Sequence, residues 1–291
     1  MSGSDIQRLR RFNRIITSAL GVLDDHYLGR GRSLGAARVL QAIGWGVHDL
    51  AMLRKRLDLD SGLMSRLLRG LEAEDLVALH ADPNDARKRL VSLTPRGQAE
   101  HSAYEELSDD FARTILHHTR DRDAFLQSVD QVAATMGRAN VVISPCDPET
   151  PDAQSALEAY CAEIAARLSH GFDPSASGGA CSDMMRAPRG CFLLAMSDDL
   201  AVGCVGLQPL GPALGEVKRL WVAPSYRGTG ISRRLMGDIE MQARDMGMDR
   251  LRLDTAEELP EARALYLRSG WREIDRYNRN PYAAYFFEKI L

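Results

Sequence analysis

The chain has 291 residues, of which 45% are hydrophobic and 26% charged, and its formal net charge at pH 7 is −3. This length and composition are typical of a globular protein with two domains, and the small net charge excludes a global field that would hold the chain on nucleic acid or a membrane. No apolar run approaches the roughly 20 residues that cross a bilayer, and the first residues lack a signal-peptide core, so we expect a cytoplasmic protein. The five cysteines show no Cys-x-x-Cys pair, which argues against a disulfide framework or a zinc site.

The first 44 residues are helical in pattern. Apolar residues at helical spacing predict one long amphipathic helix over 5–28, whose apolar face needs a partner surface, and a second helix over 34–44. A helix-turn-helix with a β-hairpin wing is predicted next, and Asp60 or Ser61 is a suitable N-cap at its turn. Its elements are helices over 47–57 and 62–72, strands over 76–79 and 90–93, and a basic hairpin tip over 82–89.

Basic side chains form two groups on this pattern. Arg66 and Arg69 are one turn apart on the second helix of the motif, and Arg87, Lys88 and Arg89 are at the hairpin tip. Such residues usually form a solvated charged face. Two basic groups on the two elements that face DNA in winged helices favour DNA binding instead.

The segment from about Asp49 to Gly97 resembles the MarR family of winged-helix regulators, most specifically in Asp85-x-Arg87 and in Val91-Ser-Leu-Thr-Pro-Arg-Gly97. In that family the Asp and the Arg stabilise the wing, and the Arg often enters the minor groove. The resemblance implies binding of a double-stranded DNA operator. The residues we expect at that interface are Ser65, Arg66, Arg69, Arg87, Lys88 and Arg89.

Two further apolar-faced helices are predicted between 96 and 139. The MarR resemblance implies that these terminal helices and the first one form a dimer interface, so we expect a homodimer on a near-palindromic operator. His117-His118 has no acidic or cysteine partner at ligand spacing, and we expect no metal. We place the domain boundary so that 1–139 is the winged-helix domain and 140–291 the second domain.

The second domain contains a strand, a loop and a helix that together can bind an anion. The strand is Glu216–Val222, Gly228 and Gly230 form the loop, and apolar residues at helical spacing continue to Met246. Glycines let the backbone approach a ligand, while the N–H groups and the positive end of the helix face a phosphate. Arg227 adds further donors. A strand over 141–144, a helix over 152–169, a long loop over 170–190 that could form part of the substrate mouth, and strands over 191–196 and 200–207 are predicted before it.

With Leu251-Arg-Leu-Asp-Thr255 and Ala262-Arg-Ala-Leu-Tyr266-Leu-Arg-Ser-Gly270-Trp271, residues 140–291 resemble the GNAT family of N-acetyltransferases. Ser232 replaces the usual Gly or Ala, and Leu259 or Pro260 stands where an Asn often begins the later helix. The expected fold is therefore an all-α winged-helix domain followed by an α/β domain with a mixed sheet. The acetyl-CoA residues that the resemblance implies are Leu220, Trp221, Val222, Arg227, Gly228, Thr229, Gly230, Ile231 and Ser232.

Acetyl transfer from a thioester to an amine needs a proton acceptor for the amine and a proton for the leaving thiolate. We expect Glu216 to be the base, through a water molecule, although an ordinary strand-end residue is an equal alternative. We expect Tyr266 to be the acid, because it stands where the family places that residue. Cys191 or Cys204 as an acyl-carrying nucleophile would need a base, and none is visible.

The sequence leaves the amine acceptor open. Arg276 or Arg279 could clamp a carboxylate, or both could be solvated turn residues, and a protein lysine is also possible. The expected protein is a DNA-binding transcriptional regulator fused to an acetyl-CoA-dependent N-acetyltransferase. The alternative is a regulator whose second domain senses acetyl-CoA or an amine without turnover.

Overall fold

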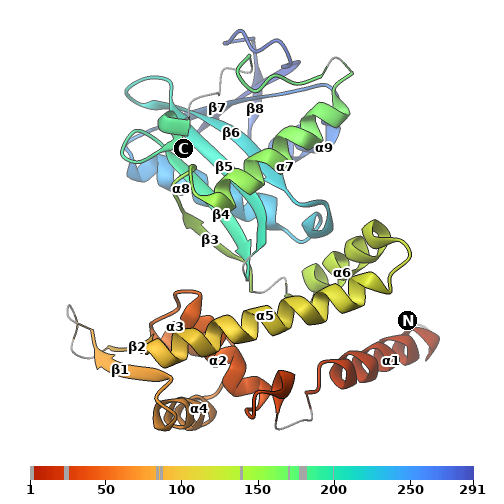
Figure 1. Ribbon diagram of the computed structural model, residues 1–291. Coiled ribbons are helices and arrows are strands. Elements are labelled where there is room, and N and C mark those ends of the chain that lie inside the picture. The colour runs from red at the N-terminus through yellow and green to blue at the C-terminus, as the bar shows by residue number, and fades with distance from the viewer. Residues whose placement is uncertain are drawn as a thin grey trace. The chain divides into compact units, whose positions relative to one another are not determined.

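The computed structural model describes residues 3–22, 26–82, 85, 88–137, 140–169, 171–176, 182–198 and 200–291. The chain forms two compact units, Met1–Arg122 and Asp123–Leu291 (Figure 1). This division falls before the expected boundary at 139/140. Helix α6 (Arg122–Gly137) belongs with the second unit because its Ala134 is buried in the core of that unit. None of the helices in these ranges has the length and apolar character that crossing a membrane requires.

The first unit contains helices and one antiparallel strand pair (Figure 1). Its elements are α1 (Gly3–Ala19), a 3-10 turn at Tyr27–Gly29, α2 (Leu34–Gly44), α3 (Leu50–Arg56), α4 (Ser61–Ala73), β1 (Val77–Ala81), β2 (Arg89–Leu93) and α5 (Pro95–His117). The predicted order of elements is confirmed within the described residues.

Helix α1 is shorter than predicted. It ends at Ala19 because Gly21 takes a left-handed φ of 59°, and the amides of Gly21 and Val22 bond back to carbonyls of the last helical turn. None of its residues is buried within the described chain. Its exposed large apolar side chains are Ile6, Leu9, Phe12 and Ile15.

The turn between α3 and α4 is fixed by side-chain caps. The Asp60 carboxylate accepts hydrogen bonds from the amides of Gly62 and Leu63 at 2.8 and 2.9 Å, so Asp60, rather than Ser61, is the N-cap of α4. The start of α3 is tied to the strand pair, because the Val91 amide donates to the His48 carbonyl at 2.9 Å. These contacts hold α3, α4 and the hairpin over one shared core.

The second unit is built on a seven-stranded mixed sheet of order β3-β4-β5-β6-β7-β9-β8. Only the β6–β7 pair is parallel. The strands are β3 (Val142–Pro145), β4 (Cys191–Ser197), β5 (Leu200–Pro209), β6 (Leu214–Val222), β7 (Arg250–Thr255), β8 (Arg272–Ile274) and β9 (Tyr285–Ile290). The helices are α6, α7 (Pro151–Arg167), α8 (Ile231–Asp245) and α9 (Pro260–Arg268), with 3-10 turns at Ser182–Met185 and Pro224–Tyr226.

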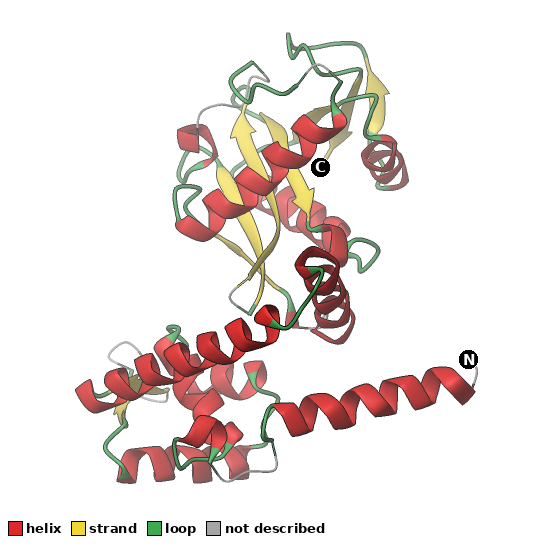
Figure 2. Ribbon diagram, turned by 45° about the vertical axis from the view of Figure 1, so that its right-hand side comes forward, coloured by secondary structure: helices red, strands yellow, loops and turns green. Residues whose placement is uncertain are grey.

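Helices cover both faces of this sheet (Figure 2). Successive residues of a strand point to opposite faces. Accordingly Phe192 and Leu194 of β4 pack in the cluster that holds Ala153 and Ala156 of α7, whereas Leu193 and Ala195 pack in the cluster that holds α8. The run Cys191–Ala195 is buried throughout for this reason. The predicted α/β fold with a mixed sheet is confirmed for this unit.

Candidate active site

Strands β6 and β7 separate after a short parallel ladder. They pair only from Leu214 to Glu216 on β6, although β6 continues to Val222. On its other side β6 carries a β-bulge, since Cys204 pairs with Trp221 and Gly206 with Lys218. Arg219 at the bulge has a left-handed φ of 58°, a conformation that is costly for a residue other than glycine and recurs at functional sites. The bulge turns the end of β6 away from β7.

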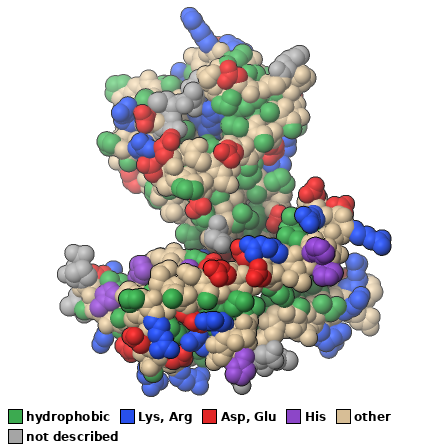
Figure 3. Space-filling view, viewed as in Figure 1, with side chains coloured by type: hydrophobic (Ala, Val, Ile, Leu, Met, Phe, Trp, Pro, Cys, Tyr) green, Lys and Arg blue, Asp and Glu red, His purple; other side chains and the backbone are tan. Residues whose placement is uncertain are grey.

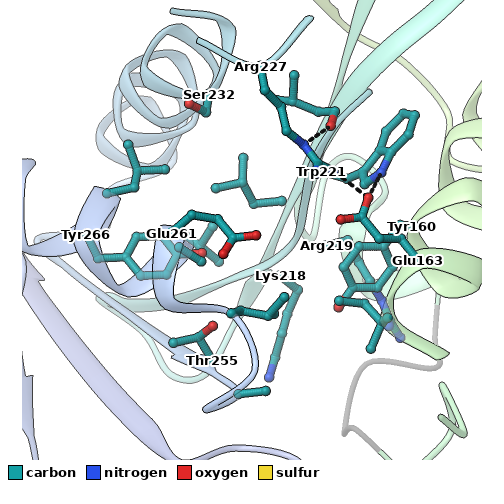
Figure 4. A pocket seen from close by; sticks show the side chains of 18 of the residues that line it. Tyr160, Glu163, Lys218, Arg219, Trp221, Arg227, Ser232, Thr255, Glu261 and Tyr266 are labelled. Carbon is teal, nitrogen blue, oxygen red and sulfur yellow. Dashed lines mark hydrogen bonds and ion pairs between the residues drawn. The ribbon is translucent and has the colours of Figure 1, made fainter. Parts of the chain in front are cut away.

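A pocket with a volume of about 560 Å³ opens at this separation (Figure 4). Residues from β6, the loop after it, α7, α8, α9 and the loop before β9 line it. All nine residues expected to bind acetyl-CoA, Leu220 to Val222 and Arg227 to Ser232, are among them. We call the part at Arg227–Ser232 the coenzyme end.

The coenzyme end is the glycine loop at the start of α8. Gly228 and Gly230 have left-handed φ values of 76° and 94°, and a built side chain at either would meet nothing within 4 Å, so the space over the loop is open. The amides in the first turn of α8 have no helical acceptor. The loop therefore presents backbone donors and a positive helix end to the pocket. Ser232 lines the pocket beside them, and its small side chain leaves this arrangement intact.

Arg227 at this end already contacts other groups of the protein. Its Nε donates to the Val222 carbonyl at 3.1 Å, and its Nη2 lies 2.5 Å from Oε2 of Glu163 on α7. The same oxygen accepts from the Trp221 indole at 3.0 Å, while Arg167 contacts the other oxygen at 3.0 Å. Glu163 was not expected from sequence, because a lone Glu on an amphipathic helix carries no specific signal. It holds α7 against the coenzyme end (Figure 4).

Tyr266 of α9 lines the same pocket. Its ring packs 5.6 Å from Phe287 and 6.2 Å from Trp271, measured between ring centroids. Burial raises the pKa of the Tyr266 hydroxyl above its ordinary value, so the group carries its proton at neutral pH. Leu259, at the position where an Asn was expected, lines the pocket without a polar side chain.

Glu216 lies beneath the pocket and does not line it. The side chain is 3% exposed, and its Oε1 accepts from the Tyr277 hydroxyl at 2.7 Å and lies 3.1 Å from Nζ of Lys218. Its Oε2 accepts from Gln208 at 2.8 Å. Lys218 also contacts Asp254 at 2.8 Å, and both Lys218 and Asp254 line the pocket. Glu216 is thus linked to the pocket by an ion cluster.

The far part of the pocket, which we call the acceptor end, combines aromatic rings with Arg219, Lys218 and Asp254. Tyr160 of α7, Phe172 and Tyr282 pack in sequence, with ring centroids 6.1 and 5.2 Å apart. The Arg219 guanidinium lies over Tyr160 and Phe172, 5.3 and 5.9 Å from their centroids. Figure 4 shows Lys218 and Arg219 away from Ser232 of the coenzyme end. Sequence reasoning missed Arg219, because the β-bulge that carries it depends on the pairing between β5 and β6.

Neither proposed carboxylate clamp in the C-terminal loop lines this pocket. Arg276 instead donates to the carbonyls of Asn280 and Ala283 at 3.2 and 2.8 Å, which closes its own loop. Arg279 is exposed. The thiols of Cys191 and Cys204 do not line it either, and burial raises the pKa of Cys191 to about 11. Among the described residues no group of three His, Cys, Asp or Glu is placed to hold a metal ion.

Five of the residues expected to contact DNA are described, and all five are exposed on the first unit: Ser65, Arg66, Arg69, Lys88 and Arg89. Arg66 and Arg69 project from α4, where Arg69 Nε donates to the Ser65 carbonyl at 3.1 Å, and the Ser65 hydroxyl donates to Ser61. Lys88 and Arg89 are exposed at the hairpin, whereas Arg87 lies outside the described residues. Basic side chains cover the part of this unit where α4 lies (Figure 3).

Two proteins of known sequence resemble part of the second unit. Over 96 residues the chain is 34% identical to an uncharacterised N-acetyltransferase of Schizosaccharomyces pombe, covering 32% of this chain and 59% of that protein. Over 106 residues it is 38% identical to the IAA acetyltransferase of Azospirillum brasilense, covering 34% of this chain and 67% of that protein. The chain thus spans less than two thirds of the first relative.

Solved structures align with about half of the chain. An acyl-CoA N-acyltransferase of Klebsiella pneumoniae aligns over 53% of this chain and 99% of its own, with 25% identity and a TM-score of 0.42. Streptococcus pneumoniae FabT in complex with DNA aligns over 46% of this chain and 98% of its own, with 14% identity and a TM-score of 0.40.

The model of the acetyltransferase (GNAT) family matches residues 158–271, which include the separated strands, the glycine loop and Tyr266. This match agrees with the pocket geometry and with the Azospirillum relative, two thirds of which the chain covers. Through this segment the chain belongs to the GNAT acetyltransferase family.

Proposed function

We propose that the second unit transfers an acetyl group from acetyl-CoA to a primary amine. One observation carries the proposal: the glycine loop at the start of α8, the end of β6 that pairs with β5 but not with β7, and the Tyr266 side chain all line one pocket. The loop amides and Arg227 suit the coenzyme pyrophosphate. The backbone of Leu220 to Val222, which has no β7 partner in the described sheet, suits the amides of the pantetheine arm.

In the proposed reaction the amine nitrogen attacks the thioester carbonyl carbon. A C–N bond forms, the C–S bond breaks, the nitrogen loses one proton and the departing thiolate takes one. Tyr266, which lines the pocket and carries its proton at neutral pH, is proposed to supply the proton to the thiolate. Coenzyme A and the acetylated amine are the products.

We propose that Glu216 accepts the amine proton indirectly. Its carboxylate is buried and contacts Tyr277, Gln208 and Lys218, so an amine in the pocket does not reach it directly. Lys218 and Asp254 stand between Glu216 and the pocket. The proton is therefore proposed to leave through a water molecule held by this cluster.

A thiol-release assay with acetyl-CoA tests this activity across a panel of amines, amino acids and lysine peptides. Turnover of at least one acceptor, abolished by omission of that acceptor, supports the enzyme. The alternative of a sensor without turnover predicts no thiol release with any acceptor, together with a change in operator affinity when acetyl-CoA or an amine is added. Failure of acetyl-CoA to bind at all, measured by calorimetry, contradicts the enzyme.

We further propose that the first unit binds a near-palindromic DNA operator as a homodimer and regulates transcription. The capped turn between α3 and α4, the antiparallel hairpin and the exposed Arg66 and Arg69 support this role. Short basic elements of this kind contact the major groove with a helix and the adjacent backbone with a hairpin.

Gel shifts at two salt concentrations test the DNA proposal. We expect Arg66→Ala and Arg69→Ala to lose sequence discrimination, whereas Arg87→Ala weakens binding evenly and lowers the salt dependence. Arg113→Ala is a matched control, because this arginine pairs with Asp109 and Asp110 on α5. The proposal is contradicted if all three test variants bind the operator as the parent protein does.

A further inference from the structure

The wall of the acceptor end is apolar. One cluster of side chains from α7, the segment after it, the β7–α9 connection and the loop before β9 forms this wall, and every member of it lines the pocket. The members are Tyr160, Ile164, Leu168, Phe172, Ala256, Leu259 and Tyr282. Such a surface favours an apolar or aromatic group, whereas a charged group placed against it would lose water without gaining a partner.

Both cations of the acceptor end have partners within the protein. Lys218 Nζ lies 3.1 Å from the Glu216 carboxylate and 2.8 Å from that of Asp254. The Arg219 guanidinium lies over two aromatic rings of the wall, 5.3 and 5.9 Å from their centroids, and its Nη2 donates to the Pro174 carbonyl at 3.3 Å. A carboxylate on the acceptor would therefore compete with groups of the protein for either cation, and burial of a carboxylate without a cation is strongly disfavoured.

The remaining cations among the described lining residues belong to the coenzyme end. Arg227 precedes the glycine loop, and Arg233 is in the first turn of α8 directly after it. Arg268 is the last residue of α9, roughly 13 Å along the helix axis from Leu259 of the acceptor wall. Arg233 and Arg268 are exposed. These positions suit the phosphate groups of the coenzyme, so the positive charge that they supply is remote from the acceptor wall.

Two carboxylates of the lining, Glu163 and Glu261, are matched by as many arginines. Glu163 contacts Arg167 at 3.0 Å and Arg227 at 2.5 Å, and Glu261 contacts Arg167 as well. Two carboxylates and two guanidinium groups leave no net charge in this group. An incoming ammonium group would therefore have to displace an arginine there.

Asp254 of β7, at the acceptor end, is matched less completely. It shares Lys218 with Glu216, so two carboxylates contact one cation and one negative charge is uncompensated. Its Oδ2 contacts Lys218 and accepts from Asn278 at 2.5 Å, whereas its Oδ1 accepts from Asn280 at 2.9 Å. A carboxylate oxygen can accept two hydrogen bonds, so Oδ1 retains capacity for a further donor. Since Asp254 lines the pocket, this capacity is next to the space that an acceptor would enter.

We propose that the acceptor is a primary amine on a single apolar or aromatic group, without a carboxylate, and that Asp254 binds its ammonium form. The inference rests on the proposed acetyltransferase activity. One proton of the ammonium leaves to solvent through the Lys218–Asp254 cluster, and the nitrogen attacks the thioester carbonyl carbon. The C–N bond forms, the C–S bond breaks, and a second proton lost by the nitrogen balances the one that the thiolate takes. The apolar group of the amine packs on Phe172 and Tyr282.

The first test compares acceptors that differ in charge, in thiol release by the full chain. Phenethylamine and isopentylamine are set against phenylalanine and leucine, which add a carboxylate to the same skeletons, and cadaverine represents an acceptor with a second positive charge. At least one monoamine should exceed its amino acid and cadaverine about 10- to 100-fold in kcat/KM, because the extra charge loses its water without gaining a partner. The amides of the two amino acids, which add bulk without charge, should lie between.

The second test changes Asp254. Asp254→Asn removes the charge at nearly the same shape and should raise the KM for the preferred monoamine about 10- to 100-fold, while the KM for acetyl-CoA stays near the parent's. Asp254→Glu retains the charge and should recover part of the affinity. Asp245→Asn is the matched control, because this exposed carboxylate at the end of α8 lies outside the pocket lining. Calorimetry with the monoamine on the coenzyme A complex reports binding independently of turnover, and thermal unfolding shows whether each variant is folded.

The proposal is overturned if the amino acids or cadaverine perform as well as the monoamines, or if the parent acetylates lysine peptides alone. It is equally overturned if a folded Asp254→Asn variant leaves the KM for the monoamine unchanged. If that variant does not fold, the comparison of acceptors with the parent protein decides. Absent acetyl-CoA binding by the parent would instead overturn the proposed function.

Discussion

The two ends of the pocket present charge in different ways. At the coenzyme end the donors are backbone amides of Gly228 to Arg233, with one half-exposed arginine that meets Glu163 in the described structure. At the acceptor end, charged side chains are buried against each other, with Lys218 and both its carboxylates less than 10% exposed. Backbone donors suit a ligand that binds and dissociates. Buried ion clusters keep their geometry and therefore discriminate between ligands.

The largest effect that we expect is a loss of turnover when Tyr266 is replaced. Tyr266→Phe removes the proposed acid while the ring keeps its contacts with Trp271 and Phe287, so kcat should fall about 100- to 10,000-fold at unchanged acetyl-CoA affinity. The raised pKa of Tyr266 implies that ionisation of this hydroxyl does not lower the parent's rate below about pH 10. Tyr285→Phe, outside the pocket lining, serves as control. Equal turnover of both variants at saturating acetyl-CoA would show that Tyr266 only packs.

At the acceptor end, Lys218→Met should lower the free energy of unfolding by about 3–5 kcal/mol, because it leaves two buried carboxylates without their shared cation. Thermal and urea unfolding measure this change. Arg250→Met on β7 is the comparison, since Arg250 is 48% exposed and lies 3.9 Å from Glu288. We expect that change to stay within about 0.5 kcal/mol. If Lys218→Met lowered the free energy of unfolding by as little as Arg250→Met, the contrast between the two ends of the pocket would not hold.

At the coenzyme end we expect substitutions to change the affinity for acetyl-CoA more than the stability of the fold. Gly230→Val places a β-branched residue at a φ of 94°, and the strain together with the added side chain over the loop should weaken acetyl-CoA binding about 10- to 100-fold in calorimetry. Gly237→Ala in the middle of α8 meets nothing within 4 Å and should stabilise the fold by about 0.5–1 kcal/mol with unchanged affinity. Equal affinities in the two variants would argue against a phosphate over this loop.

The smallest effect concerns Glu163. Since its carboxylate contacts Arg227 at 2.5 Å, acetyl-CoA must compete with it for that arginine. Glu163→Gln should therefore tighten acetyl-CoA binding about 3- to 10-fold, while Arg227→Ala should weaken it about 10-fold. Glu158→Gln, exposed on the same helix, is the control. Weaker binding by the Glu163 variant would mean that Glu163 contacts the coenzyme directly.

Local pattern predicted the strand, the glycine loop and the helix of the coenzyme end. Gly228, Gly230 and Arg227 are close in sequence, and a strand, a glycine turn and a helix in succession permit few arrangements of the backbone. The role of Tyr266 was expected from a family resemblance in Ala262–Trp271, which covers part of α9 and the turn after it, and it stays a prediction. The caps of α3 and α4 likewise depend on an Asp directly before each helix, at Asp49 and Asp60.

Tertiary structure alone decided the acceptor end. Tyr160, Phe172, Arg219 and Tyr282 come from four separate segments, and no spacing along the chain relates them. The bulge that directs Arg219 into the pocket arises from pairing between β5 and β6, which a single strand's pattern does not specify. For the same reason Glu216, a strand-end carboxylate in the sequence, lies in a buried ion cluster whose members Asp254 and Tyr277 come from β7 and from the loop between β8 and β9. Short-range periodicity determines which segment forms which element, and the burial of charges depends on which elements meet.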